Sequence, residues 1–197
     1  FGIRHEGAAA FAASGYAKLT GRPAACLSIA GPGATNLLTG LWDAKVDRAP
    51  LLALTGQVDT QVLGPGAFQE IDLAAAYDSV ASFSQTVLPD SRHAELMNLA
   101  CKHALVERDV AHLIFPDEVQ NLVVSEEAGA GDPAGRLADQ QIAPPQAVVA
   151  RAAQMLTAAT RPVIIVGFGA REGMGPVLEL AEQLGAPVLT TFKAKGQ

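Results

Sequence analysis

The chain contains little cysteine, few aromatic residues and few charges. Two of its 197 residues are cysteine, 5% are aromatic and 17% are charged. Cys26 and Cys101 lie far apart in the sequence, which excludes a disulfide framework and a cysteine-rich metal site. Both cysteines occur in apolar segments, so we expect both side chains to be buried.

The charge balance and the apolar content exclude further classes of protein. Lys and Arg number 14 against 20 Asp and Glu, and the formal net charge of −6 excludes the basic stripe of a nucleic-acid-binding protein. Hydrophobic residues make up 49% of the chain, which excludes an intrinsically disordered protein. No apolar run is long enough to span a membrane and no signal peptide is recognisable, so we expect a cytoplasmic protein.

Turn residues divide the first part of the chain into alternating strands and helices. Short apolar runs predict strands over residues 24–30, 50–55, 79–87 and 110–115. The helices expected between them cover residues 5–19, 34–45, 70–77 and 91–107. Residues 56–69 lack periodicity and are expected to form a long loop. This alternation predicts an α/β domain with a parallel sheet and flanking helices.

A polar segment separates this part from a second unit. Residues 123–143 contain several glycines and no period, which predicts a linker between a first domain over 1–122 and a second over 144–197. The second domain is expected to be a truncated Rossmann-like α/β domain, with a helix, strand, helix and strand over residues 145–158, 162–166, 174–184 and 187–191. Because the chain begins at Phe1 rather than Met and stops directly after a strand, we expect a fragment of a longer protein.

Two candidate functional segments begin helices of the first domain. Glu6 follows an expected strand end and starts an Ala-rich helix, where it is either a carboxylate favoured by the helix dipole or an acid that shares its proton with a ligand base. Gly31-Pro32-Gly33-Ala34-Thr35-Asn36 lies between a strand and a helix. Taken alone, it is either a phosphate cradle or a tight turn.

Two further candidate segments follow strands. Gln57 lies at the carboxyl edge of the expected sheet, where open α/β sheets bind ligands. Phe68 and Gln69 end the long loop, either as a packed loop tip or as part of a lid over a substrate. In the second unit, the turn Gly167-Phe168-Gly169-Ala170-Arg171 could cradle dinucleotide phosphates, which the arginine would pair with.

Taken together, these segments resemble the thiamine-diphosphate-dependent enzymes of the acetolactate synthase and pyruvate oxidase superfamily. The motifs that carry the resemblance are Arg4-His5-Glu6, Gly15-Tyr16-Ala17, Gly31 to Asn36, Asp47-Arg48-Ala49-Pro50, Gly56-Gln57 and Phe68-Gln69-Glu70. The resemblance implies that the first domain is most of the pyrimidine-binding domain, without its first strand and helix. It implies that the second unit begins the central domain, which carries FAD in some members.

The resemblance also implies roles for individual residues. Glu6 would be the catalytic acid that hydrogen-bonds a ring nitrogen of the aminopyrimidine, with its pKa raised by partial burial so that it can share a proton. The residues implied on the pyrimidine side of the cofactor are Glu6, Pro32, Asn36 and Gln57, which places the Gly31–Asn36 turn against this ring rather than against phosphates. Those implied beside the substrate or the flavin are Phe68 and Gln69. Those implied at FAD are Gly167, Gly169, Ala170 and Arg171.

The family holds Mg²⁺ and the cofactor diphosphate through a Gly-Asp-Gly…Asn motif in a further domain. Gly-Asp-Gly does not occur in this sequence, so we assign no metal ligand to it. The family's active site forms between subunits, which implies that a second copy of the same protein completes the site. We therefore expect the present chain to be inactive alone.

The reaction implied is decarboxylation of a small 2-keto acid such as pyruvate, most like pyruvate oxidase with FAD. The same motifs leave open a carboligase of the acetolactate synthase or glyoxylate carboligase type, and sulfoacetaldehyde acetyltransferase. Two other classes remain as alternatives: an NAD(P)-dependent oxidoreductase built on the second unit, and a non-catalytic nucleotide-binding module.

Overall fold

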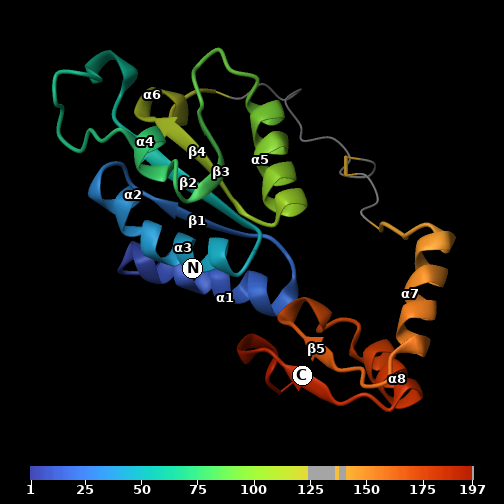
Figure 1. The fold of residues 1–197 in the computed structure, drawn as a ribbon. Coiled ribbons are helices and arrows are strands. Elements are labelled where there is room, and N and C mark those ends of the chain that lie inside the picture. Colours follow the sequence, from blue (N-terminus) through green and yellow to red (C-terminus); the bar gives the residue numbers. More distant parts are fainter. Residues whose placement is uncertain (124–135, 138–140, 197) are drawn as a thin grey trace. The chain divides into compact units, whose positions relative to one another are not determined.

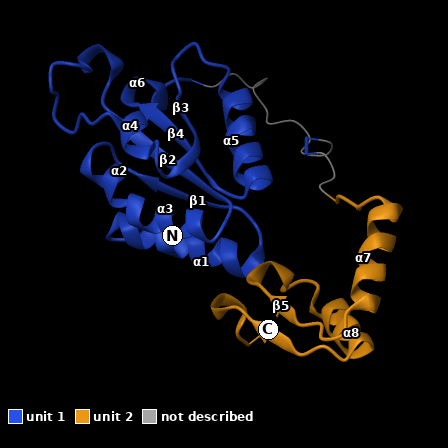
Figure 2. Ribbon diagram, viewed as in Figure 1, with its two compact units in different colours: residues 1–140 blue, residues 141–197 orange. Residues whose placement is uncertain are grey.

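The computed structural model describes residues 1–123, 136–137 and 141–196, which belong to two compact units over residues 1–140 and 141–197 (Figure 2). Most of the linker expected over 123–143 lies outside the described residues. The domain boundaries at 122 and 144 therefore stay predictions. Each unit is an α/β structure in its own right and is described separately below.

Unit 1 is built on a parallel sheet of four strands in the order β1-β2-β4-β3. The strands are β1 (Ala24–Ser28), β2 (Leu51–Gln57), β3 (Ala81–Thr86) and β4 (Val110–Pro116). All residues of β4 except Phe115 are buried, as expected for a central strand covered on both faces. The parallel arrangement brings the carboxyl ends of all four strands to one edge, and the predicted α/β fold class is confirmed.

Helices cover both faces of this sheet (Figure 1). Helices α1 (Glu6–Thr20) and α3 (Leu38–Val46) pack on one face, where the core is formed largely by alanine and leucine. Helix α5 (His93–Glu107) packs on the other face through Ala100 and Ala104. The many small side chains let helices approach the sheet closely, as the composition of the chain indicates.

The packing of α1 against α3 fixes the position of the start of α1. A Cβ atom on Gly40 would lie 2.6 Å from Ala10 Cβ, so the two helices touch almost backbone to backbone. At the other end of the contact, Lys18 Nζ lies 2.6 Å from Asp43 Oδ2 and 2.7 Å from Asp47 Oδ2. The crossing is thus set by close contact and by an ion-pair cluster.

Shorter elements surround the carboxyl edge of the sheet. They are α2 (Pro32–Asn36), η1 (Thr60–Val62), α4 (Leu73–Tyr77) and α6 (Asp117–Gln120). The helix expected over 34–45 starts earlier and is divided at Leu37 into α2 and α3. Strand β2 runs on through Gln57, so the long loop begins later than expected, and no strand is present within residues 1–5.

Unit 2 begins with α7 (Gln146–Ala158) and β5 (Ile164–Val166), followed by η2 (Phe168–Ala170), α8 (Met174–Leu184), β6 (Val188–Thr190) and η3 (Phe192–Ala194). Strands β5 and β6 pair in parallel, as the predicted Rossmann-like start requires. The expectation that both cysteines are buried is wrong for Cys101, which is exposed on α5, whereas Cys26 is buried. Within the described residues, no helix is long and apolar enough to span a membrane.

Candidate active site

Glu6 is the first residue of α1, and its side chain meets a residue from a distant part of the sequence. His5 precedes the helix as its N-cap, and its Nδ1 accepts a hydrogen bond from the Gly7 N–H at 3.1 Å. The Glu6 side chain is half-buried, and its Oε2 accepts a hydrogen bond from Asn36 Nδ2 at 3.2 Å. The structure therefore brings together two of the predicted site residues, from α1 and from the end of α2.

Glycine is required on both sides of this pair. A Cβ atom on Gly7 would lie 3.1 Å from the Asn36 carbonyl oxygen, so the starts of α1 and α3 approach closely there. A Cβ atom on Gly33 would lie 3.2 Å from Glu6 Oε1 and 2.6 Å from Ile29 Cγ2. The absence of a side chain at Gly33 leaves one oxygen of Glu6 uncovered on the side of the α2 turn.

The pKa of Glu6 is lowered, whereas the sequence predicted that burial would raise it. The main causes are a hydrogen bond from the backbone N–H of Glu6 itself and the hydrogen bond from Asn36, and these outweigh the opposing effect of desolvation. Both donors favour the ionised form, so Glu6 is a carboxylate at neutral pH. In this state it can accept a hydrogen bond but cannot donate one.

Two cavities lie beside this region. A cavity of ≈ 620 Å³ is lined by Glu6 and by mostly apolar residues of the chain start, α1 and β1. A second cavity of ≈ 490 Å³ lies at the carboxyl edge of the sheet, between the segments that follow β1, β2 and β4. Gln57 and Gln69 line the second cavity, as expected for residues beside a ligand at this edge.

The side chain of Gln57 is already engaged within the protein. Its Nε2 donates to the Ile71 carbonyl oxygen at 2.8 Å, and its Oε1 accepts from the Val58 N–H at 2.9 Å. Gln57 is buried and joins the two ends of the loop that connects β2 to α4. The contact that the structure gives Gln57 is thus with this loop, and its role at the pyrimidine stays a prediction.

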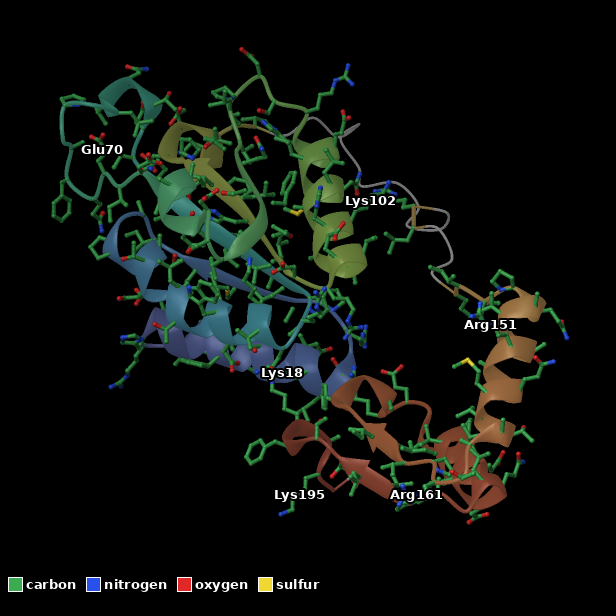
Figure 3. The ribbon with its side chains drawn as sticks, in the orientation of Figure 1. Lys18, Glu70, Lys102, Arg151, Arg161 and Lys195 are labelled. Atoms are coloured by element: carbon green, nitrogen blue, oxygen red, sulfur yellow. The ribbon has the colours of Figure 1, made fainter. Side chains whose placement is uncertain are left out.

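Carboxylates organise the same loop, and the sequence analysis did not identify them. Glu70, labelled in Figure 3, accepts hydrogen bonds from the N–H groups of Gly64, Gly66 and Ala67 at 2.7, 3.0 and 2.8 Å. These donors lower its pKa. Glu118 of α6 accepts a 2.5 Å hydrogen bond from Thr60 Oγ1 at the start of the loop. The loop is therefore held at both ends by anions.

Phe68 and Gln69 occupy the end of this organised loop. Phe68 is 89% exposed, so it is not the packed loop tip that was one of the two interpretations. Gln69 has a positive φ of 68° and lies against Gly31, where a Cβ atom would be 2.8 Å from Gln69 Cβ. The loop thus touches the turn that carries Pro32, whose exposed side chain has no contact with Glu6 that the structure records.

The predicted nucleotide-binding turn of unit 2 has space around its glycines. Cβ atoms on Gly167 and Gly169 would have no neighbour within 4 Å, so packing within the chain does not require glycine at either position. The guanidinium of Arg171 lies 4.6 Å from the centre of the Phe168 ring, and its Nη2 is 3.4 Å from Glu172 Oε1. Ala170 ends the short helix η2 between them.

Both units match known protein families. Residues 1–76 match the N-terminal TPP binding domain of thiamine pyrophosphate enzymes, and residues 149–197 match the central domain of the same enzymes. The chain belongs to the thiamine pyrophosphate enzyme family. Its relatives in this family include acetolactate synthases and a pyruvate oxidase, as the resemblance in the sequence predicts.

Three relatives show how much of a family member the chain represents. YdaP of Bacillus subtilis, described by name only as thiamine pyrophosphate-containing, is 38% identical over 98% of the chain and 33% of its own length. An acetolactate synthase of Arthrospira platensis is 37% identical over 99% of the chain and 34% of its own length. A pyruvate oxidase of Lactiplantibacillus plantarum is 33% identical over 98% and 32%. The chain therefore spans about a third of the length of these thiamine pyrophosphate enzymes.

Residues that could bind a metal ion are not grouped in the described parts of the two units. No set of three or more His, Cys, Asp or Glu side chains there could hold one. The candidate site of this thiamine pyrophosphate enzyme chain consists instead of a carboxylate, an amide and a glycine turn. These groups suit an uncharged or cationic nitrogen heterocycle better than a phosphate.

Proposed function

We propose that unit 1 binds the aminopyrimidine of thiamine diphosphate in an enzyme that decarboxylates a small 2-keto acid such as pyruvate. One observation carries the proposal: the Glu6 carboxylate is oriented by Asn36 and left open on the side of Gly33. The arrangement fits the group, because an acceptor oxygen is available and a flat ring needs the space that a side chain at position 33 would fill.

The residues of the chain would act on the ring through one proton. A ring nitrogen of the aminopyrimidine is a base, and Glu6 would share a proton with it in a charge-assisted hydrogen bond. Asn36 would keep the carboxylate in place, and a ring that covers Glu6 would remove water and shift its pKa upward from the lowered value of the open site. The cofactor itself supplies an electron sink for the cleavage of a bond next to a carbonyl.

We propose that Pro32 and Gln57 border the same ring, and that Phe68 and Gln69 border the substrate or a flavin. The exposure of Phe68 supports this, because a large apolar side chain held out by an organised loop is available to a ligand or to another subunit. The remaining parts of the site, with the ligands of Mg²⁺, would come from residues outside this chain and from a second copy of the protein.

Two reactions of the proposed intermediate step remain to be separated. We propose a pyruvate-oxidase-like reaction with FAD held by Gly167, Gly169, Ala170 and Arg171, since the two glycines leave open space beside a cation. A carboligase reaction is the second candidate, because acetolactate synthases match the chain at 37% and 36% identity, at least as well as the pyruvate oxidase.

The experiment uses the complete enzyme supplied with thiamine diphosphate, Mg²⁺ and pyruvate. Consumption of pyruvate that is lost in Glu6→Gln supports the proposal, and unchanged consumption in this variant contradicts it. A flavin spectrum with acetyl phosphate or acetate as product identifies the oxidase. Acetolactate as product identifies the carboligase.

The flavin assignment has its own test. Arg171→Ala should weaken FAD retention by about tenfold or more, since a charge-assisted hydrogen bond contributes ~1.5–3 kcal/mol. Arg161, an exposed arginine of unit 2, provides the control variant Arg161→Ala. Equal flavin occupancy in the two variants would reject Arg171 as an FAD contact.

A further inference from the structure

A buried hydroxyl holds the backbone of the turn that carries Asn36. Tyr77, the last residue of α4, is fully buried, and its O–H donates to the Ala34 carbonyl oxygen at 2.6 Å. The same carbonyl accepts the Leu37 N–H at 3.2 Å. This is the point where α2 ends and α3 begins, directly beside Asn36.

The ring of Tyr77 is fixed from below by a histidine in the centre of the sheet. The Tyr77 and His112 rings stack with their centroids 3.7 Å apart and an angle of 16° between their planes. His112 Nε2 is 2.8 Å from Thr55 Oγ1 on β2, and its Nδ1 is 2.9 Å from Ser84 Oγ on β3. Since both ring nitrogens have partners, the imidazole cannot rotate without losing them.

Burial also fixes the protonation of the two rings. It lowers the pKa of His112 to about 3, so the imidazole is neutral at physiological pH. It raises the pKa of Tyr77, so the phenol keeps the proton that it donates to Ala34. A phenylalanine would fill the same space, and a buried hydroxyl is unfavourable unless it is paired. The hydroxyl therefore indicates a requirement at the Ala34 carbonyl rather than in the core.

We infer that Tyr77 is a positioning residue for the cofactor site: by fixing the Ala34 carbonyl it sets the break between α2 and α3 and thereby the direction of the Asn36 amide toward Glu6. Tyr77 touches neither Glu6 nor any ligand in this scheme and acts through the backbone. The inference rests on the proposed function, because the consequence that matters is the binding of the aminopyrimidine. Its supporting contacts are the 2.6 Å bond to Ala34 and the 3.2 Å bond from Asn36 to Glu6.

The test compares two variants that each remove one hydroxyl from the same buried column. Tyr77→Phe keeps the stacked ring and loses the bond to Ala34, whereas Ser84→Ala loses a bond to His112 on the side away from the turn. In the complete enzyme without cofactor, Tyr77→Phe should speed amide hydrogen exchange at Leu37 by about tenfold, and Ser84→Ala should not. Thiamine diphosphate affinity should fall about 5- to 10-fold in Tyr77→Phe only.

A double-variant cycle shows whether the effect passes through Asn36. If it does, Tyr77→Phe has little further effect on thiamine diphosphate affinity once Asn36→Ala is present. Fully additive losses of affinity would overturn the inference, as would equal effects of Tyr77→Phe and Ser84→Ala on exchange and affinity. Faster exchange in Tyr77→Phe with unchanged affinity would overturn it too.

The proposed function fails by a different result. Glu6→Gln does not touch the Ala34 carbonyl, so exchange at Leu37 should stay as in the unaltered protein whether or not Glu6 serves the cofactor. Loss of the proposed function would appear as unchanged affinity and unchanged turnover in Glu6→Gln. The exchange difference between Tyr77→Phe and Ser84→Ala is independent of that result.

Discussion

The crossing of α1 and α3 predicts that a single methyl group at Gly40 destabilises the protein and disturbs the candidate site. In Gly40→Ala the new Cβ atom would lie 2.6 Å from Ala10 Cβ, 2.6 Å from the Phe11 nitrogen and 2.8 Å from the Ala10 carbonyl carbon. Two of these three atoms belong to the backbone, so a side-chain rotation cannot relieve the overlap. The helices must separate instead.

The size of the effect follows from these distances. Carbon atoms in favourable contact are ~3.5–4.0 Å apart, so the helices would have to move apart by about 1 Å. Overpacking of this kind lowers the free energy of unfolding by about 1–3 kcal/mol. Because Glu6 begins α1 and Asn36 precedes α3, the same movement would lengthen the 3.2 Å hydrogen bond between them. We therefore expect weaker thiamine diphosphate binding as well as lower stability.

Gly15 provides the matched control within α1. A Cβ atom there has no neighbour within 4 Å, so Gly15→Ala should raise the free energy of unfolding by about 0.5–1 kcal/mol through helix propensity and the unfolded-state entropy. The assay is urea unfolding of both variants, followed by circular dichroism. The reasoning is refuted if Gly40→Ala is as stable as the unaltered protein, or if the two variants change stability in the same direction.

Two further predictions concern the charged groups of unit 1. Glu70→Gln should loosen the loop, because an amide cannot replace a carboxylate that accepts three N–H bonds; the amides of Gly64, Gly66 and Ala67 should exchange several-fold faster, while Glu107→Gln on the exposed end of α5 should leave them unchanged. His112 stays neutral when folded, with a pKa of about 3, but takes up a proton near pH 6.5 when unfolded, so the folded state loses up to ~1.4 kcal/mol per pH unit as pH falls from about 6.5. Urea unfolding at pH 7 and pH 5 should show this slope, and His112→Asn should remove it; an equal slope in both proteins would contradict the assignment.

Much of the fold could be predicted because its elements follow local patterns. The strands β1, β2 and β4 are short apolar runs between turn residues, and α5 and α8 lie within one or two residues of their expected bounds. The division of the 34–45 helix at Leu37 could not be predicted, since it depends on Tyr77, a residue 43 positions from Ala34. A local reading of the sequence contains no signal for such a contact.

The candidate site could be predicted in its residues but not in its electrostatics. The motif order placed Glu6 and Asn36 in one site, and the hydrogen bond between them agrees with that placement. The direction of the Glu6 pKa shift was predicted wrongly, because the N–H donors around a helix start are backbone groups that the side-chain sequence does not reveal. The same holds for Glu70, whose partners are all backbone N–H groups of its own loop.

The central claim is that the Glu6 carboxylate shares a proton with the aminopyrimidine of bound thiamine diphosphate. The most direct measurement is the rate of deuterium exchange at the thiazolium C2 carbon of the cofactor bound to the complete enzyme, in the unaltered protein, in Glu6→Gln and in the control Glu107→Gln. The account predicts exchange slowed by about 100-fold or more in Glu6→Gln and normal exchange in the control. Exchange at the normal rate in Glu6→Gln, with the cofactor bound, would contradict it.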